Sequence, residues 1–229
     1  MSERTGKIDF HYGSKTYQTW YKVVGDIKSG VRPAVVLHGG PGISHHYVLP
    51  FTDLYTRYGI PVVFYDQIGI GESSHPKDVP KEFWTLELFM DELDNLLEHL
   101  DIKKGFDLCG HSWGAMLAAH YASHRHPAGL QHLVIASGAP SMPHWVKSVR
   151  RLLAKLPEDL REMLERHEKE GTTDEPEYQA GMQIFYRKHV CLLDPWPKEL
   201  LDSFSAMEAD PVVYKTTCVF LRIYAFRGG

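Results

Sequence analysis

The sequence Gly-His-Ser-Trp-Gly at residues 110–114 places a serine between two glycines. A short apolar run, 106–109, precedes it, and a run of small residues with helical character, 115–122, follows it. A serine at a sharp turn from a strand into a helix presents its hydroxyl, and flanking glycines let the neighbouring backbone approach closely. The motif alone is weak evidence, but this context predicts that Ser112 is the nucleophile of an acyl-transfer reaction.

Acyl transfer through a serine also needs hydrogen-bond donors for the oxyanion that develops on the substrate carbonyl. The N–H of Trp113, the residue after the nucleophile, is one candidate. The second is expected in a loop after an earlier strand, and His-Gly-Gly-Pro-Gly at 38–42 follows the apolar run 34–37. We expect Gly40 to supply this donor, with Gly39 as the alternative and as part of the substrate-binding loop.

The general base for this serine and the acid that orients it are not identifiable from the sequence. His38 precedes the serine, whereas folds with this type of turn supply the base last in chain order, so we expect a structural, hydrogen-bonded histidine. His111 is expected to pack beside the turn. Three residues satisfy the order but lie in a helical segment rather than at strand ends: Asp159, Asp174 and His189.

The elements that must position these residues alternate between strands and helices. Two stretches of β-formers, 8–12 and 17–24, flank a turn and predict an opening hairpin. Thr85 is a candidate N-cap for a helix with apolar residues at helical spacing. Short runs that are apolar on both faces are typical of central parallel strands. They occur at 34–37 and 61–65, and two further strands are expected at 106–109 and 133–136. Helices are expected between them, at 46–58, 85–100 and 115–122.

After residue 140 the pattern changes to consecutive helices, and the loops between them are rich in Gly, Thr, Asp and Pro. The expected helices are 145–156, 157–170, 177–193 and 197–207. The strand and helix order before this point predicts an α/β fold with a mostly parallel sheet and right-handed crossovers. We therefore expect a core at 1–140, an inserted helical cap at 141–214 and a divergent tail at 215–229.

Three motifs in this order resemble the proline iminopeptidase family, serine peptidases that release N-terminal residues, often proline. They are residues 38–42, Asp-Gln-Ile-Gly-Ile-Gly-Glu-Ser at 66–73, and 110–114, and the match extends over about residues 5–214. The first motif together with Trp113 is its most specific part. The resemblance implies an α/β-hydrolase fold with a helical cap, and hydrolysis of peptides or amides through an acyl-enzyme on Ser112.

The resemblance also implies cap carboxylates that hold the α-ammonium group of the substrate, and Glu208 is the candidate here. The family pattern would continue after Thr216 into Gly-Pro-x-Glu-Phe and two strands that carry the acid and the base, but residues 217–229 do not follow it. We therefore expect the C-terminal part of the core to be missing. The alternatives are an esterase or other small-molecule α/β-hydrolase, and a catalytically impaired truncated form or pseudoenzyme.

Composition limits the partners of this chain of 229 residues. It has 25 Lys and Arg against 29 Asp and Glu, a net charge of -4 that provides no basic field for nucleic acid or anionic lipid. No apolar run approaches membrane-spanning length and the N-terminus is polar, so we expect a cytoplasmic protein. Three widely spaced cysteines and no metal-binding motif predict no disulfide framework, metal or cofactor. The sequence leaves the oligomeric state open.

Overall fold

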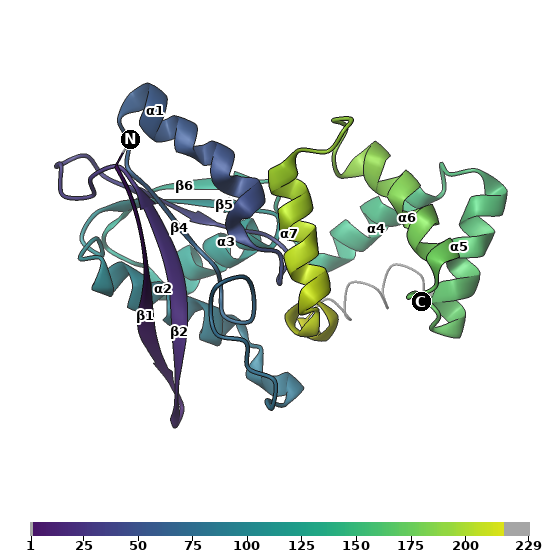
Figure 1. Ribbon diagram of the computed structural model, residues 1–229, viewed down its shortest axis with the longest axis horizontal. Helices are drawn as coiled ribbons and strands as arrows, with labels where there is room; N and C mark the ends of the chain where they lie inside the picture. The colour runs from purple at the N-terminus through teal and green to yellow at the C-terminus, as the bar shows by residue number, and fades with distance from the viewer. Residues whose placement is uncertain (1, 218–229) are drawn as a thin grey trace. The chain divides into compact units, whose positions relative to one another are not determined.

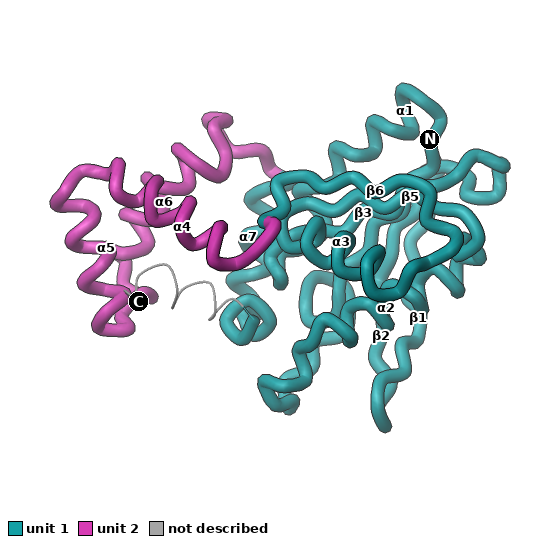
Figure 2. The backbone as a smooth tube through the Cα atoms, turned by 180° about the vertical axis from the view of Figure 1, so that it is seen from behind, with its two compact units in different colours: residues 1–139, 199–218 teal, residues 140–198, 219–229 magenta. Residues whose placement is uncertain are grey.

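The computed structural model describes residues 2–217, and these form two compact units (Figure 2). The first unit contains residues 2–139 and 199–217, and the second contains 140–198. The expected cap extended to residue 214, whereas the structure groups α7 (Lys198–Ala209), from Glu199 onward, with the first unit. Ser203 on this helix accepts a hydrogen bond from the N–H of Tyr47 at 3.0 Å, which ties α7 to the core.

The described part of the first unit contains a six-stranded sheet in the order β1-β2-β4-β3-β5-β6 (Figure 1). The hairpin predicted at its start is present, and β2 also pairs antiparallel with β4, while β3, β4, β5 and β6 run parallel. The mostly parallel sheet is therefore confirmed. The strands are β1 (Glu3–Tyr12), β2 (Lys15–Val24), β3 (Ala34–Leu37), β4 (Val62–Tyr65), β5 (Phe106–His111) and β6 (Leu130–Ala136).

The central strands are apolar on both faces because helices cover both sides of the sheet. Val35 and Leu37 of β3 join the core beneath α2 (Leu86–His99) and α3 (Trp113–Arg125). Ala34 and Val36 join the other core, against η1 (His45–Thr52) and α1 (Asp53–Tyr58). Figure 1 shows this sandwich of helices around the sheet. The carboxyl ends of the central strands therefore carry the loops in which the candidate site residues lie.

Two of the expected crossover helices illustrate how local sequence sets these elements. Thr85 caps α2 as predicted, since its side chain accepts a hydrogen bond from the N–H of Leu88 at 3.1 Å. The helix expected at 46–58 instead begins as a 3-10 segment, η1, which contains Pro50. Proline cannot donate a backbone hydrogen bond, so the α-helical pattern starts only after it, at Asp53.

β6 contains the strand expected at 133–136. It is the last strand of the described sheet and its middle is exposed. Val134 and Ile135 keep 46% and 47% of their surface accessible. A run of consecutive apolar residues indicates a strand, but it does not indicate where in the sheet that strand lies.

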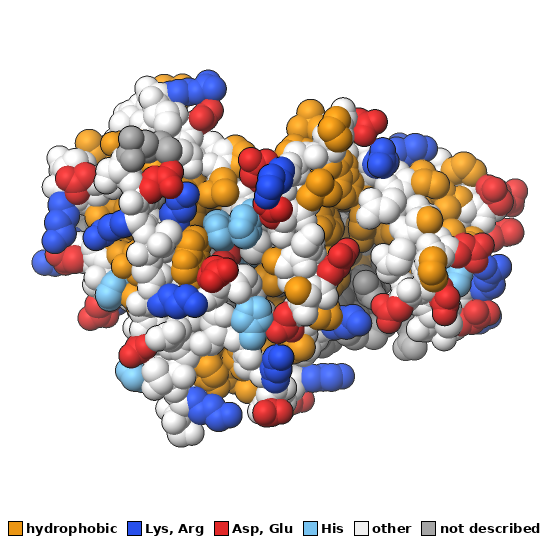
Figure 3. Space-filling view, viewed as in Figure 1, with side chains coloured by type: hydrophobic (Ala, Val, Ile, Leu, Met, Phe, Trp, Pro, Cys, Tyr) orange, Lys and Arg blue, Asp and Glu red, His pale blue; other side chains and the backbone are white. Residues whose placement is uncertain are grey.

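The second unit has its own small core. Its helices are α4 (Met142–Leu153), α5 (Glu158–Glu170) and α6 (Pro176–His189), close to their expected positions. Leu164 and Tyr178 are among the residues buried between them. No described helix has the length and apolar character needed to cross a membrane. Acidic and basic side chains are interspersed over the molecular face shown in Figure 3, consistent with the small net charge.

Candidate active site

Ser112 occupies a strained turn between the end of β5 and the start of α3. Its backbone has φ 55° and ψ -118°, a conformation that non-glycine residues rarely adopt. The turn is held because the N–H of Ser112 donates to the carbonyl of Ala136, at the end of β6, at 2.9 Å. The predicted strand, sharp turn and helix are all present, and together they expose the serine at the carboxyl edge of the sheet.

The two glycines of this turn are required by close backbone approach. A Cβ on Gly110 would lie 2.2 Å from the carbonyl oxygen of Gly114, one turn further on. A Cβ on Gly114 would lie 2.2 Å from the carbonyl oxygen of Leu37, at the end of β3. Separations below about 3 Å between such atoms are not tolerated, so the start of α3 packs against β5 only with glycine at 110, and against the end of β3 only with glycine at 114.

The loop after β3 lies against the nucleophile, as expected for an oxyanion loop. A Cβ on Gly39 would be 3.1 Å from the Cβ of Ser112. The N–H of Gly39 donates to the hydroxyl oxygen of Tyr47 at 2.6 Å, so this group is already engaged within the protein. Trp113 is the first residue of α3, where a backbone N–H has no acceptor inside the helix. The role of Gly40 as the second donor stays a prediction.

His38 is buried and hydrogen-bonded at both ring nitrogens, in agreement with its expected structural role. Its Nδ1 donates to the carbonyl of Gly39 at 3.0 Å, and its Nε2 accepts from the N–H of Gln67 at 2.9 Å. Burial lowers the pKa of His38 to about 4, so the ring is neutral at pH 7. Because the N–H and C=O of a trans peptide point in opposite directions, this bond to Gly39 sets the direction of the following N–H, that of Gly40.

Two further polar residues support the site, and the sequence analysis did not assign them a role. The side chain of Gln67 accepts a hydrogen bond from the indole of Trp113 at 3.0 Å and donates to the carbonyl of His38 at 3.0 Å. Asp66 is fully buried and accepts from both the backbone and the ring of His45, at 2.9 and 2.8 Å. Burial would raise the pKa of Asp66, but the hydrogen bond and charge of His45 outweigh it and lower the pKa. Asp66 and Gln67 are adjacent in the 66–73 motif, and this was the feature of the sequence that could have indicated their supporting role.

Known proteins share both the sequence and the fold of this chain. The α/β hydrolase fold family matches residues 33–198. The crystal structure of proline iminopeptidase from Mycobacterium smegmatis is 39% identical with a TM-score of 0.80, covering 92% of this chain and 70% of that chain. The chain belongs to the proline iminopeptidase family. The fold and the family expected from the motifs are therefore confirmed.

Other known proteins match over the same region. The crystal structure of VinJ is 47% identical with a TM-score of 0.86, again covering 92% of this chain and 70% of that chain. Proline iminopeptidase from Lactobacillus helveticus is 38% identical over 183 residues, which are 80% of this chain and 61% of the relative. Proline iminopeptidase from Saccharolobus solfataricus is 37% identical over 193 residues, which are 84% of this chain and 60% of the relative. The chain thus spans about three fifths of the length of these curated relatives.

No described side chain of this family member forms a hydrogen bond with the hydroxyl of Ser112. His111 instead contacts Tyr47, with its Nδ1 2.9 Å from the tyrosine oxygen, and burial lowers the pKa of this histidine. The residues that satisfy only the chain order lie in the second unit, away from any strand end: Asp159 on α5, Asp174 in the following turn and His189 at the end of α6. Within residues 2–217, the structure shows the turn at Ser112 beside the loop at 38–42, while the nucleophile, the oxyanion donors and the base stay predictions.

The remaining candidate site residue is Glu208, which is exposed near the end of α7. It follows Ser203, the residue that packs on η1, by five positions, which corresponds to about 140° around the helix. Glu208 therefore points away from the face of α7 that contacts the core. Its proposed contact with a substrate ammonium group stays a prediction.

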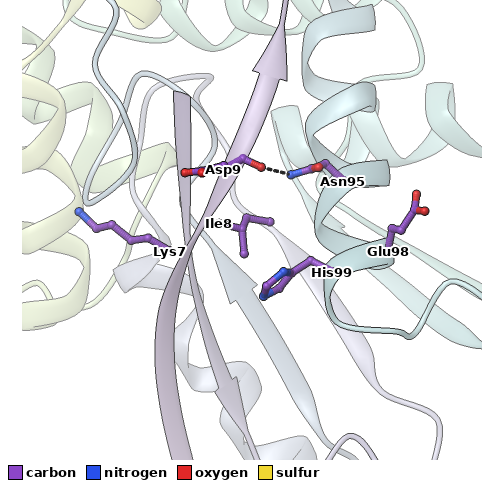
Figure 4. Close-up of a pocket in the computed structure, with 6 residues that line it drawn as sticks. All are labelled: Lys7, Ile8, Asp9, Asn95, Glu98 and His99. Carbon is purple, nitrogen blue, oxygen red and sulfur yellow. Dashed lines mark hydrogen bonds between the residues drawn. The ribbon is translucent and has the colours of Figure 1, made fainter. Parts of the chain in front are cut away.

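A separate pocket of about 460 Å³ lies between β1 and α2 (Figure 4). The side-chain amide of Asn95 donates to the backbone carbonyl of Asp9 across it at 3.0 Å. Its lining consists of Lys7, Ile8, Asp9, Asn95, Glu98 and His99. None of these residues belongs to the nucleophile turn or the oxyanion loop, so this pocket is not the site of the chemistry described above.

Proposed function

We propose that this chain is a serine hydrolase of the proline iminopeptidase type, which releases an N-terminal residue, proline or similar, from a small peptide or amide. The observation that carries the proposal is the strained turn at Ser112, packed against the loop that contains Gly39 and Gly40. The family names of its relatives support the substrate class. We also propose, from the sequence, that the protein works in the cytoplasm.

In this mechanism the hydroxyl oxygen of Ser112 attacks the carbonyl carbon of the N-terminal residue. The oxyanion that forms accepts hydrogen bonds from the N–H groups of Trp113 and Gly40. Collapse of the tetrahedral intermediate expels the amine and leaves an acyl-enzyme on Ser112, which water then hydrolyses. His38 is neutral and already bonded at both nitrogens, so it orients the loop and does not take the proton of the serine.

The proton of Ser112 needs a general base, and we propose that the base and its acid belong to the part of the family fold that this chain does not span. The chain covers about 61% of its curated relatives, which leaves room for them. Without these two groups, oxyanion stabilisation and binding remain. The turnover of the 229-residue chain is then expected to be about a thousandfold or more below that of a complete enzyme.

Replacing Ser112 with alanine should abolish labelling by a fluorophosphonate, because the strained turn between β5 and α3 presents its hydroxyl next to candidate oxyanion donors. Labelling of the wild-type chain is expected to be slow but stoichiometric, measured by intact mass over hours. Ser123→Ala is the matched control, since Ser123 lies exposed on the same helix. Unchanged labelling of the Ser112→Ala protein would refute the proposed nucleophile.

The chain should prefer substrates with a free N-terminal amine, because the resemblance implies cap carboxylates that hold the ammonium group, and Glu208 is the candidate for this role. Acetylation of a prolyl anilide is expected to lower kcat/KM by about tenfold or more, and Glu208→Gln should reduce this preference. The rates are measured at high protein concentration, with Ser112→Ala as the blank. Equal rates on free and acetylated substrates, or a clear preference for acyl esters, would favour the esterase alternative.

A further inference from the structure

Tyr47, on η1, connects the two halves of the candidate site. Its hydroxyl oxygen accepts a hydrogen bond from the N–H of Gly39 at 2.6 Å and lies 2.9 Å from Nδ1 of His111. The phenol ring and the imidazole also meet edge to face, with ring centres 5.3 Å apart. Gly39 precedes the expected oxyanion donor Gly40, and His111 directly precedes Ser112. A single oxygen atom therefore bridges the oxyanion loop and the nucleophile turn.

The tyrosine hydroxyl has a single proton to share within this bridge. Its oxygen accepts from Gly39, and we assign its proton to a hydrogen bond with Nδ1 of His111. Burial raises the pKa of Tyr47, so the phenol stays protonated. Burial lowers the pKa of His111, which favours the neutral ring, and a neutral ring with its proton on Nε2 can accept at Nδ1. In this arrangement the donors run from Gly39 through Tyr47 to His111.

The bridge is held from both sides by close packing. A Cβ on Gly39 would lie 2.7 Å from the hydroxyl oxygen of Tyr47 and 3.1 Å from the Cβ of Ser112. The backbone N–H of Tyr47 donates to Ser203 on α7 at 3.0 Å, which fixes η1 at this residue. The phenol consequently cannot move away from the loop without breaking several contacts, and the loop cannot move away from Ser112 without breaking the bond to the phenol.

We propose that Tyr47 is a positioning residue that sets the spacing between the oxyanion donors and the nucleophile Ser112. This inference rests on the proposed function and deepens it, because neither the motifs nor the relatives assign Tyr47 a role. Oxyanion stabilisation depends steeply on geometry, and a misplacement of about 1 Å can cost a hundredfold in rate. Loss of one bridging oxygen should therefore slow attack on an electrophile much more than it alters the fold.

The test is the substitution Tyr47→Phe, which removes only the bridging oxygen. The rate constant for phosphonylation of Ser112 is expected to fall about tenfold. Tyr65→Phe is the matched control, because the Tyr65 hydroxyl is buried without a hydrogen-bond partner among the described residues, so its removal breaks none of the hydrogen bonds of the site. Tyr65→Phe should label within about twofold of wild type. Equal rates for Tyr47→Phe and Tyr65→Phe would overturn the proposal.

A double-mutant cycle separates positioning from general destabilisation. His111→Leu removes the acceptor of the tyrosine proton, so Tyr47→Phe in that background should slow labelling by no more than about twofold further. A full tenfold loss in the His111→Leu background would contradict the bridge. The ring nitrogen shifts of His111 in ¹⁵N spectra give an activity-independent readout: in the wild type Nδ1 is the unprotonated acceptor, and its resonance should move in Tyr47→Phe but not in Tyr65→Phe.

The spectra also distinguish a failure of this inference from a failure of the proposed function. If wild-type labelling does not depend on Ser112, the proposed nucleophile is wrong and Tyr47 cannot act as its positioning residue, whatever the spectra show. If labelling depends on Ser112 but both the rate and the His111 resonances are unchanged in Tyr47→Phe, the inference alone fails. A changed resonance together with the slowed, Ser112-dependent rate supports both.

Discussion

Gly114→Ala should abolish the labelling of Ser112 and destabilise the fold, although alanine is the better helix former. Alanine gains about 1 kcal/mol over glycine in a helix interior. Against this, the added Cβ would lie 2.2 Å from the carbonyl oxygen of Leu37 and 2.6 Å from that of His38. Both are backbone atoms that cannot rotate away, so α3 must separate from β3. We expect a net loss of about 3 kcal/mol in the free energy of unfolding, since strong overpacking typically costs this much.

The matched control for this substitution is Gly105→Ala, just before β5. A Cβ at Gly105 meets no atom within 4 Å, so the free energy of unfolding and the labelling rate of Gly105→Ala should equal those of the wild type. Urea denaturation gives the free energy of unfolding, and intact mass gives the extent of labelling. If Gly114→Ala and Gly105→Ala behave alike in both measurements, the close approach between α3 and β3 does not hold in solution.

The features that could be predicted from the sequence are those encoded within short segments. The turn at Ser112 needs only a strand, two glycines and a helix in about fifteen consecutive residues, and the structure has all of them. The N-cap at Thr85 is equally local, because the donor is three residues away. The loop at 38–42 could be placed beside the nucleophile because the carboxyl ends of parallel strands meet at one edge of a sheet.

The features that could not be predicted depend on pairs far apart in the chain. Tyr47 and His111 are 64 positions apart, and Gln67 and Trp113 are 46 positions apart. Each pair meets because β3, β4 and β5 are neighbours in the sheet, and no local pattern fixes which side chains then face each other. The position of α7 could not be predicted for the same reason. The spacing of its apolar residues predicts a helix, but it does not show that Ser203 contacts Tyr47 of η1.

Glu92 was also missed, because its spacing on α2 is that of an apolar core residue. Its carboxylate is fully buried and accepts hydrogen bonds from the hydroxyl of Thr19 at 2.6 Å and from the N–H of Ile68 at 3.0 Å. It therefore ties β2 and the loop after β4 to the helix. Burial raises the pKa of Glu92 from 4.5 to about 8.

Glu92→Gln should therefore remove much of the pH dependence of stability between about pH 4.5 and 8. In this window the folded state keeps a proton on Glu92 that the unfolded state has released, so the stability of the wild type falls as pH rises. Each pKa unit corresponds to about 1.4 kcal/mol, and a glutamine can still accept from Ile68 and donate to Thr19. At pH 8 we expect Glu92→Gln to exceed the wild type by about 2–4 kcal/mol in the free energy of unfolding, and at pH 5 to match it or fall slightly below.

Urea denaturation of both proteins at several pH values measures this difference in the free energy of unfolding. The stability that the neutral His38 contributes is lost as pH falls from 6.5 towards 4, which is the opposite pH dependence. Both proteins contain His38, so its contribution cancels in the difference. Parallel stability curves for the two proteins would mean that Glu92 titrates near its ordinary value, and that the carboxylate is solvated rather than enclosed between α2, β2 and the loop after β4.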